Sequence, residues 1–259
     1  MRDGVAFCVL AGVVLSASAL PPASLARETV VFVEAHPDDL ASHAGTAILL
    51  AEKFDVKVVD FTRGENGIDE AAFRDGSCAR KRVQEEKNAC AFLGTEPVFM
   101  DEVNYKGSMA YANERTTRRM SALFADWKPR AVFLHWPLDV HPDHVQSTAA
   151  ALHALSLAKL SPEIYFHTQP IQTRNFQPRY WVDVARVKEK KTALVNCYAC
   201  QGPKELLDQF EVDSVFRSRR IGTWADLPSD VPRIESFAVW DGSVKQGRSV
   251  LFELDAPVR

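Results

Sequence analysis

The stretch TVVFVEAHPDD, residues 29–39, joins an apolar, β-branched run to a group of histidine, proline and aspartate residues. The run predicts a buried strand over Thr29 to Glu34, with a helix following over Ala44 to Lys53. A second His-Pro-Asp, His141 to Asp143, also follows an apolar run, Ala131 to His135, and precedes a helical pattern. Chemically reactive residues therefore stand at the ends of two predicted strands.

The rest of the chain alternates strand and helix patterns. Further strands are predicted over Val56 to Phe61, Pro97 to Met100, Ile164 to His167, Trp181 to Val184, Phe237 to Trp240 and Ser249 to Leu254, and helices over Ser77 to Leu93, Ala112 to Trp127, Val145 to Leu155 and Ala185 to Tyr198. This alternation predicts right-handed crossovers and an α/β, Rossmann-like fold, with a mostly parallel sheet covered by helices on both faces. No repeat or composition shift divides the chain, so we predict one domain over residues 27–259.

Composition limits the partners that the protein can have. The 259 residues are 46% hydrophobic and 25% charged, which is typical of a chain that folds around an apolar core. The net charge is only −3, whereas nucleic acids and anionic membranes are bound by clustered positive charge. We therefore expect neither a nucleic-acid partner nor a membrane span. A near-neutral surface suits an uncharged small molecule or glycan.

Residues 1–26 have the pattern of a secretory signal peptide: the apolar run Val5 to Leu15 is followed by small residues. The run is shorter than the roughly 20 apolar residues that cross a bilayer. A buried first strand or helix is the alternative. We expect an exported protein, periplasmic or secreted. The cysteines beyond this segment are an even number that an oxidising compartment could pair; they are Cys78, Cys90, Cys197 and Cys200. The lone Cys-x-x-Cys leaves both a local disulfide and two reduced thiols open.

The two His-Pro-Asp segments together indicate a metal site. In open parallel sheets, ligands bind beyond the carboxyl ends of the strands, where the strand order reverses. If the two strands are neighbours there, one crevice holds His36, Asp38, Asp39, His141 and His144. Two imidazoles and a carboxylate are a ligand set of catalytic zinc, which lowers the pKa of bound water to roughly 7. Helix capping alone would explain the acids and prolines, but not the three histidines.

Four motifs resemble the signatures of the PIG-L/LmbE deacetylases, in order and spacing, from Thr29 to about Leu157. They are Ala35-His36-Pro37-Asp38-Asp39 with Gly45, Thr62-x-Gly64-x-x-Gly67, Arg82-x-x-Glu85-x-x-x-Ala89-x-x-x-Leu93-Gly94, and His135-Trp136-Pro137-x-Asp139-x-His141-Pro142-Asp143-His144. The resemblance implies an LmbE-like fold and a zinc-dependent hydrolase of a linear amide bond. Such an enzyme removes the N-acetyl group from an N-acetylglucosamine-containing sugar, glycolipid or glycoconjugate by attack of zinc-bound water. Fe²⁺ or another divalent ion is an alternative to zinc.

The resemblance also implies roles for single residues. The metal ligands would be His36, Asp39 and His144; Asp38 would be the general base, His141 would stabilise the oxyanion or protonate the departing amine, and Asp143 would orient the imidazoles. Sugar contacts would come from Arg74 and Asp101, with Arg63 or Asn66 as alternatives and surface ion pairs as the competing interpretation. The chain departs from the family pattern at Leu40, where members often have Glu, and at Tyr198 and Cys200, which replace His and Ser before Gln201.

Two other functions compete with deacetylation. A non-catalytic, metal-containing sugar-binding module would need neither a base such as Asp38 nor an acid such as His141. A dinucleotide-binding protein would carry Gly-x-Gly-x-x-Gly after the first strand, where this chain has His-Pro-Asp-Asp. The sequence therefore favours the hydrolase.

Overall fold

The computed structural model describes residues 27–104, 110–210, 234–245 and 247–258, so the predicted export signal, residues 1–26, lies outside the described part. In chain order, with η for 3-10 helices, the elements are β1 (Thr29–Glu34), η1 (Asp39–His43), α1 (Ala44–Ala51), β2 (Asp55–Thr62), α2 (Glu70–Arg74), α3 (Ser77–Cys90), η2 (Ala91–Leu93), β3 (Val98–Glu102), α4 (Glu114–Trp127), β4 (Ala131–His135), α5 (Pro142–Leu157), β5 (Glu163–His167), β6 (Tyr180–Asp183), η3 (Ala185–Val187), α6 (Lys188–Val195), η4 (Ala199–Gln201), β7 (Ile234–Val239) and η5 (Val250–Glu253). Residues 203–210 are also helical.

The strand order places the ends of β1 and β4 side by side. The seven-stranded sheet has the order β3-β2-β1-β4-β5-β7-β6, and β1 pairs in parallel with both β2 and β4. The first three strands thus add in order on one side of β1, and the chain then crosses back so that β4 pairs on the other side of β1. The predicted neighbours across the reversal are confirmed, and their carboxyl ends open at one edge of the sheet.

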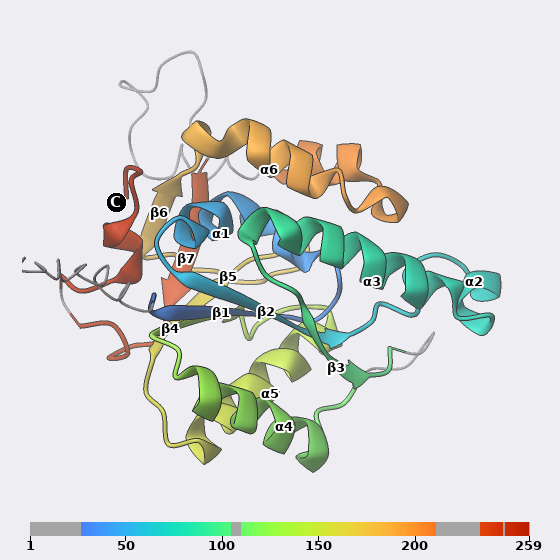
Figure 1. Cartoon of the computed structure of the whole chain (residues 1–259), viewed down its shortest axis with the longest axis horizontal. Helices are drawn as coiled ribbons and strands as arrows, with labels where there is room; N and C mark the ends of the chain where they lie inside the picture. Colours follow the sequence, from blue (N-terminus) through green and yellow to red (C-terminus); the bar gives the residue numbers. More distant parts are fainter. Residues whose placement is uncertain (1–26, 105–109, 211–233, 246, 259) are drawn as a thin grey trace, which may run out of the picture.

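The sheet lies between two helical layers, as predicted. Helices α1, α3 and α6 cover one face, and α4 and α5 cover the other (Figure 1). Alternate residues of β1 serve the two cores: Val30 and Phe32 pack in the core with α1 and α6, whereas Val31 and Val33 pack in the core with α4 and α5. A strand buried on both faces needs this continuous apolar sequence.

One sequence prediction differs from the structure near the C-terminus. The predicted strand over Ser249 to Leu254 is wrong: η5 occupies Val250–Glu253, because the Ser249 side chain accepts a hydrogen bond from the Leu251 amide and starts a turn. Strand β7 is the last strand in chain order. It lies between β5 and β6 in the sheet and runs antiparallel to both. The short helix α2 was not predicted, although Asp69 caps it through the Ala72 amide at 2.8 Å.

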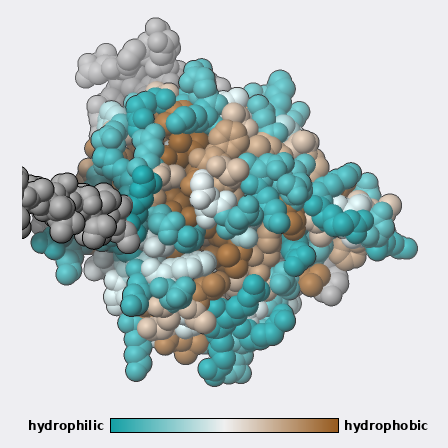
Figure 2. Space-filling view, viewed as in Figure 1, coloured by the Kyte–Doolittle hydropathy of each residue, from teal (hydrophilic) through white to brown (hydrophobic). Residues whose placement is uncertain are grey.

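Hydrophilic side chains cover the projecting helices, and hydrophobic ones show between them (Figure 2). Within the described ranges, no helix combines the length and the apolar character that crossing a bilayer requires. The four described cysteines are free thiols, so of the two alternatives for Cys197 and Cys200 the structure has the reduced thiols and not the local disulfide.

Candidate metal centre

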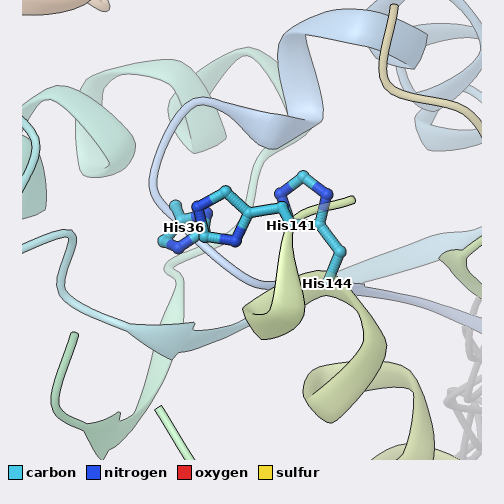
Figure 3. A group of neighbouring side chains, drawn as sticks. All are labelled: His36, His141 and His144. Carbon is cyan, nitrogen blue, oxygen red and sulfur yellow. The ribbon is translucent and has the colours of Figure 1, made fainter. Parts of the chain in front are cut away.

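The two His-Pro-Asp segments meet in one cavity at the carboxyl ends of β1 and β4. The cavity has a volume of about 340 Å³, and the five residues expected in it are among its lining: His36, Asp38, Asp39, His141 and His144. Figure 3 shows the rings of His36, from the loop after β1, and of His141 and His144, from the start of α5. His141 is the N-cap residue of α5 and Pro142 is in its first turn, which suits the fixed backbone angle of proline.

The distances between candidate ligand atoms fit a divalent cation. Asp39 lies between the two predicted histidines: its Oδ2 is 3.3 Å from His36 Nδ1 and its Oδ1 is 3.5 Å from His144 Nε2. Two groups around this point have one donor atom per residue within 4.8 Å of one another, and they are His36–His141–His144 and Asp39–His135–His144. The predicted triad of His36, Asp39 and His144 is not itself such a group. His141 and His135, which complete these two groups, are therefore competing third ligands.

Carboxylates fix the orientation of both predicted histidine ligands. Asp143 Oδ2 is 3.0 Å from His36 Nε2, which leaves Nδ1 facing Asp39. Asp139 Oδ1 is 3.3 Å from His144 Nδ1, which leaves Nε2 facing Asp39. Metal-binding histidines commonly have such a carboxylate on the second ring nitrogen. The sequence motif indicated this role for Asp143 but not for Asp139, although Asp139 belongs to the same motif.

The charges around Asp39 support its ionised form. Burial alone would raise the pKa of this carboxyl, but the neighbouring His144 and His135 hold it well below its usual range. Burial alone would lower the pKa of His144, but Asp39 and Asp139 raise it to about 10. For His141, burial and the nearby His36 lower the pKa to about 4. The site thus combines an anionic ligand with imidazoles of very different basicity.

Asp38 is held in an unusual backbone conformation beside a buried arginine. Its φ of 123° lies in a region that side-chain-bearing residues rarely adopt. Arg82 donates hydrogen bonds to Asp38 Oδ1 and to the Pro37 carbonyl. Burial raises the pKa of Asp38 to about 6, against the lowering effect of Arg82. A carboxyl with this pKa is deprotonated at neutral pH yet basic enough to accept a proton.

The loop over residues 62–67, called the glycine loop below, packs closely against Arg82, and its two glycines leave the space that the arginine side chain fills. A Cβ atom at Gly64 would lie 2.6 Å from the guanidinium carbon, and one at Gly67 would lie 2.1 Å from Nη1. Thr62 anchors the loop, because its hydroxyl donates to the Ala35 carbonyl at 2.9 Å and accepts from the Gly64 amide at 3.1 Å. The motifs that begin at Thr62 and Arg82 therefore form a single support for Asp38.

The residues expected to contact sugar are placed elsewhere. Arg63 and Asp101 form an exposed ion pair with each other at 2.7 Å, and Arg74 pairs with Glu70 on α2. None of the three is among the described residues that line the cavity. Polar side chains that do line it are Asn66, Asn104, Gln172 and Gln201. Asn66 was expected only as an alternative sugar contact. Asn104 and Gln172 come from loops without a motif, so no sequence signal pointed to them.

The two departures near Gln201 lie behind the cavity wall. Tyr198 is fully buried, and the Cys200 thiol donates to Glu85 Oε2 at 2.8 Å. The Gln201 amide donates to the Gly67 carbonyl at 2.9 Å. This segment therefore braces the glycine loop and does not contribute a titratable group to the cavity. Leu40, the third departure, is a fully buried core residue.

Comparison with known proteins gives one family and a set of similar folds. The family model described as "PIG-L: GlcNAc-PI de-N-acetylase" matches residues 31–155. No curated protein sequence matches the chain. A similar solved structure is GalB, the 4-carboxy-2-hydroxymuconate hydratase from Pseudomonas putida KT2440, with 22% identity over 86% of this chain and 100% of that chain and a TM-score of 0.72.

Two further similar structures are deacetylases. The N,N'-diacetylchitobiose deacetylase from Pyrococcus horikoshii has 20% identity, covers 83% of this chain and 84% of that chain, and has a TM-score of 0.66. A deacetylase of the teicoplanin biosynthesis pathway has 15% identity, covers 83% and 99% of the two chains, and has a TM-score of 0.61. At these identities the similarity establishes the fold.

Proposed function

Because residues 31–155 form a PIG-L domain, we propose that the protein is a metal-dependent hydrolase that removes the N-acetyl group from an N-acetylglucosamine-containing sugar, glycolipid or glycoconjugate. The family and the deacetylase neighbours support a sugar deacetylase type of function. The observation that carries the proposal is the position of Asp38, a carboxylate with a pKa near 6, in the same cavity as Asp39 and three imidazoles.

The donor atoms of the cavity fit a divalent cation. Imidazole nitrogens and one carboxylate are a ligand set of zinc and of Fe²⁺. We propose that His36, Asp39 and His144 hold the ion, because carboxylates already fix both of these imidazoles. An ion held there would supply Lewis acidity toward the amide carbonyl and lower the pKa of water. We propose zinc as the first choice.

Each step of amide hydrolysis then has a candidate side chain. Asp38 takes the proton from the attacking water, and Arg82 keeps its carboxylate in position. His141 is neutral at pH 7 because its pKa is lowered to about 4, so it either donates its ring N–H to the developing oxyanion or relays the proton taken by Asp38 to the departing amine nitrogen, which must leave as a neutral amine. Asp143 maintains the orientation of His36. Asn66, Asn104 and Gln172 line the cavity and are suited to sugar hydroxyls.

The cavity is of the size that holds one small ligand, since small-molecule pockets begin at about 300 Å³. A larger glycan would extend beyond it. We therefore keep Arg63, Arg74 and Asp101 as proposed contacts only for the outer part of such a substrate. Replacing any of them by alanine should therefore raise the KM for a disaccharide and leave the turnover of a monosaccharide unchanged.

The proposal is tested by measuring acetate released from N-acetylglucosamine and N,N'-diacetylchitobiose by the zinc-loaded protein. We expect Asp38→Asn to lower kcat by about 10²–10⁴-fold, the usual contribution of a general base, and His144→Ala to lower bound metal as well. His153→Ala is the matched control, because His153 lies outside this cavity. Acetate release that survives both substitutions would refute the mechanism.

A hydratase is the second candidate function, and the likeness to the hydratase GalB favours it. Both reactions use an activated water, so the cavity alone does not separate them. Loss of the ultraviolet absorbance of a conjugated enoate, with no acetate release from any acetamido sugar, would support the hydratase. A non-catalytic sugar-binding module would bind the acetamido sugar and return it unchanged.

We also propose that residues 1–26 direct export to the periplasm or beyond the cell. The support is the sequence pattern alone. The mature protein recovered from the outside compartment should begin near residue 27. A full-length protein that stays inside the cell would refute this.

A further inference from the structure

A second group of side chains with metal-ligating donor atoms, none of them in the lining of the cavity, lies at the ends of three adjacent strands. Glu34 is the last residue of β1, His135 the last of β4, and His167 the last of β5. His135 and His167 pair directly in the sheet register. The relative exposure of the three residues is 0–1%. They form one of the groups whose donor atoms lie within 4.8 Å of one another.

The distances in this group are those of ligands that share an ion. Glu34 Oε2 is 3.4 Å from both His135 Nε2 and His167 Nε2. A good N–H···O hydrogen bond measures 2.7–3.2 Å, and neither Glu34 Oε2 nor His167 Nε2 has a hydrogen-bond partner in the described structure. Two ligand atoms that bind one tetrahedral zinc at 2.0–2.1 Å are about 3.4 Å apart.

The other carboxylate oxygen of Glu34, Oε1, is held in place by His43, which is not itself one of the three proposed ligands. His43 Nε2 is 2.9 Å from Glu34 Oε1, and His43 Nδ1 is 2.8 Å from the Ser42 hydroxyl. This chain of contacts directs Oε2 toward the other two histidines, as outer partners of metal-binding carboxylates do. Among the described residues, every ion-pair partner of Glu34 within 4.0 Å is a histidine. A buried carboxylate without a lysine or arginine partner needs another cation or a proton.

The backbone hydrogen bonds around His135 are compatible with an ion bound to its Nε2 atom. The Ala35 amide lies 3.2 Å from His135 Nε2, but it is equally 3.2 Å from Asp39 Oδ2. The amide therefore keeps an acceptor when the imidazole lone pair turns to an ion. A cavity of about 20 Å³, lined by His43, His167 and Ser42 among others, adjoins the group. It has room for about one water, which would provide a fourth ligand.

We propose that Glu34, His135 and His167 bind a second divalent cation, distinct from the ion of the cavity above. One carboxylate and two imidazoles suit zinc or a neighbouring transition metal. The site is structural: it neutralises Glu34 and fixes His135, whose Nε2 is 3.3 Å from Asp39 Oδ2. The inference does not depend on the deacetylase reaction, because it concerns the number of ions and not what they catalyse.

The test is zinc stoichiometry. The full chain is stripped with a chelator, reloaded with zinc, passed through a desalting column and measured by elemental analysis. We expect two zinc ions per chain for the wild type, one for His144→Ala, one for His167→Gln and none for the double variant. His153→Gln, which changes a histidine outside both sites, should keep two.

Two results would overturn the proposal: one zinc per wild-type chain, or two zinc ions retained by His167→Gln. A single ion that is insensitive to His167 would mean that the buried group is a hydrogen-bond network only. If His167→Gln does not fold, as judged by circular dichroism, His144→Ala decides alone, since retention of one ion supports the second site and loss of all zinc refutes it. Failure of the proposed function would look different: two bound ions and no acetate release.

Discussion

Replacing Arg82 by methionine tests whether this arginine sets the proton affinity of the proposed base. The guanidinium is buried and donates to Asp38 and to the Pro37 carbonyl. Its positive charge favours the ionised carboxylate, so its loss raises the pKa of Asp38. A general base works only when deprotonated. The acid limb of the kcat/KM profile, expected near pH 6 from the pKa of Asp38, should therefore move to higher pH.

The size of the shift follows from the short distance and the partial exposure of Asp38. Two unit charges about 4 Å apart interact by about 4 kcal/mol at an effective dielectric constant of about 20. The Asp38 side chain is 18% exposed, and water in the cavity screens part of this interaction. We expect the limb to rise by about one to two pH units, within the range that a neighbouring charge commonly produces. At pH 6, where half of the wild-type Asp38 is deprotonated, this corresponds to a loss of about 5–50-fold in kcat/KM.

The assay is acetate release from N,N'-diacetylchitobiose between about pH 5 and about pH 8, the range in which proteins tend to be most stable, with both enzymes fully loaded with zinc. Any effect of the ion on Asp38 is then common to both. Arg82→Lys is the matched control, because it keeps the charge and should keep the limb near its wild-type position. An Arg82→Met variant that folds and retains the wild-type limb would refute the electrostatic role of Arg82 and leave it only a packing role.

Two further substitutions test the supports of the site. Asp139→Asn should weaken zinc binding by about 10–100-fold, the usual effect of removing an outer carboxylate from a ligand such as His144; unchanged affinity in a chelator competition would contradict the orienting role. Glu235→Gln should lower the free energy of unfolding in urea by about 3 kcal/mol, because it leaves the buried ammonium of Lys191, 2.6 Å away, without its anion. Asp255→Asn, in an exposed ion pair, is the control and should be silent.

The fold was predictable wherever the local pattern and the tertiary packing agree. The strand Thr29–Glu34 is apolar from Val30 to Val33 and has a polar residue at each end, so its limits in the structure match the prediction. Ser249–Leu254 has the same apolar character, yet it folds as a 3-10 turn because the Ser249 hydroxyl captures a nearby amide. One local hydrogen bond decided this segment, and hydrophobic periodicity does not report it.

The site was predictable where the residue type itself reports the chemistry. Histidines and aspartates in two repeated tripeptides pointed to one cavity, and the structure brings them there. Asn104 and Gln172 were missed because an amide side chain in a loop gives no pattern. Glu34 was read only as the end of a strand. Its partners, His135 and His167, end other strands, so the buried group becomes visible only when the sheet register is known.

The insertion of β7 between β5 and β6 has a consequence for how the molecule is made. Strand β6 reaches the sheet only through β7, so it has no partner strand until residues 234–239 have left the ribosome. Glu235 in β7 also accepts hydrogen bonds from the Gly45 and Thr46 amides, at the start of α1 directly after η1. The segment that carries His36 and Asp39 is thus synthesised early, but the hydrogen bonds from Glu235 that hold the start of the following helix form only late in synthesis. The cavity at the ends of β1 and β4 would be fully supported only near the end of translation, and a fragment ending at residue 155 would leave the edge of β4 open to aggregation.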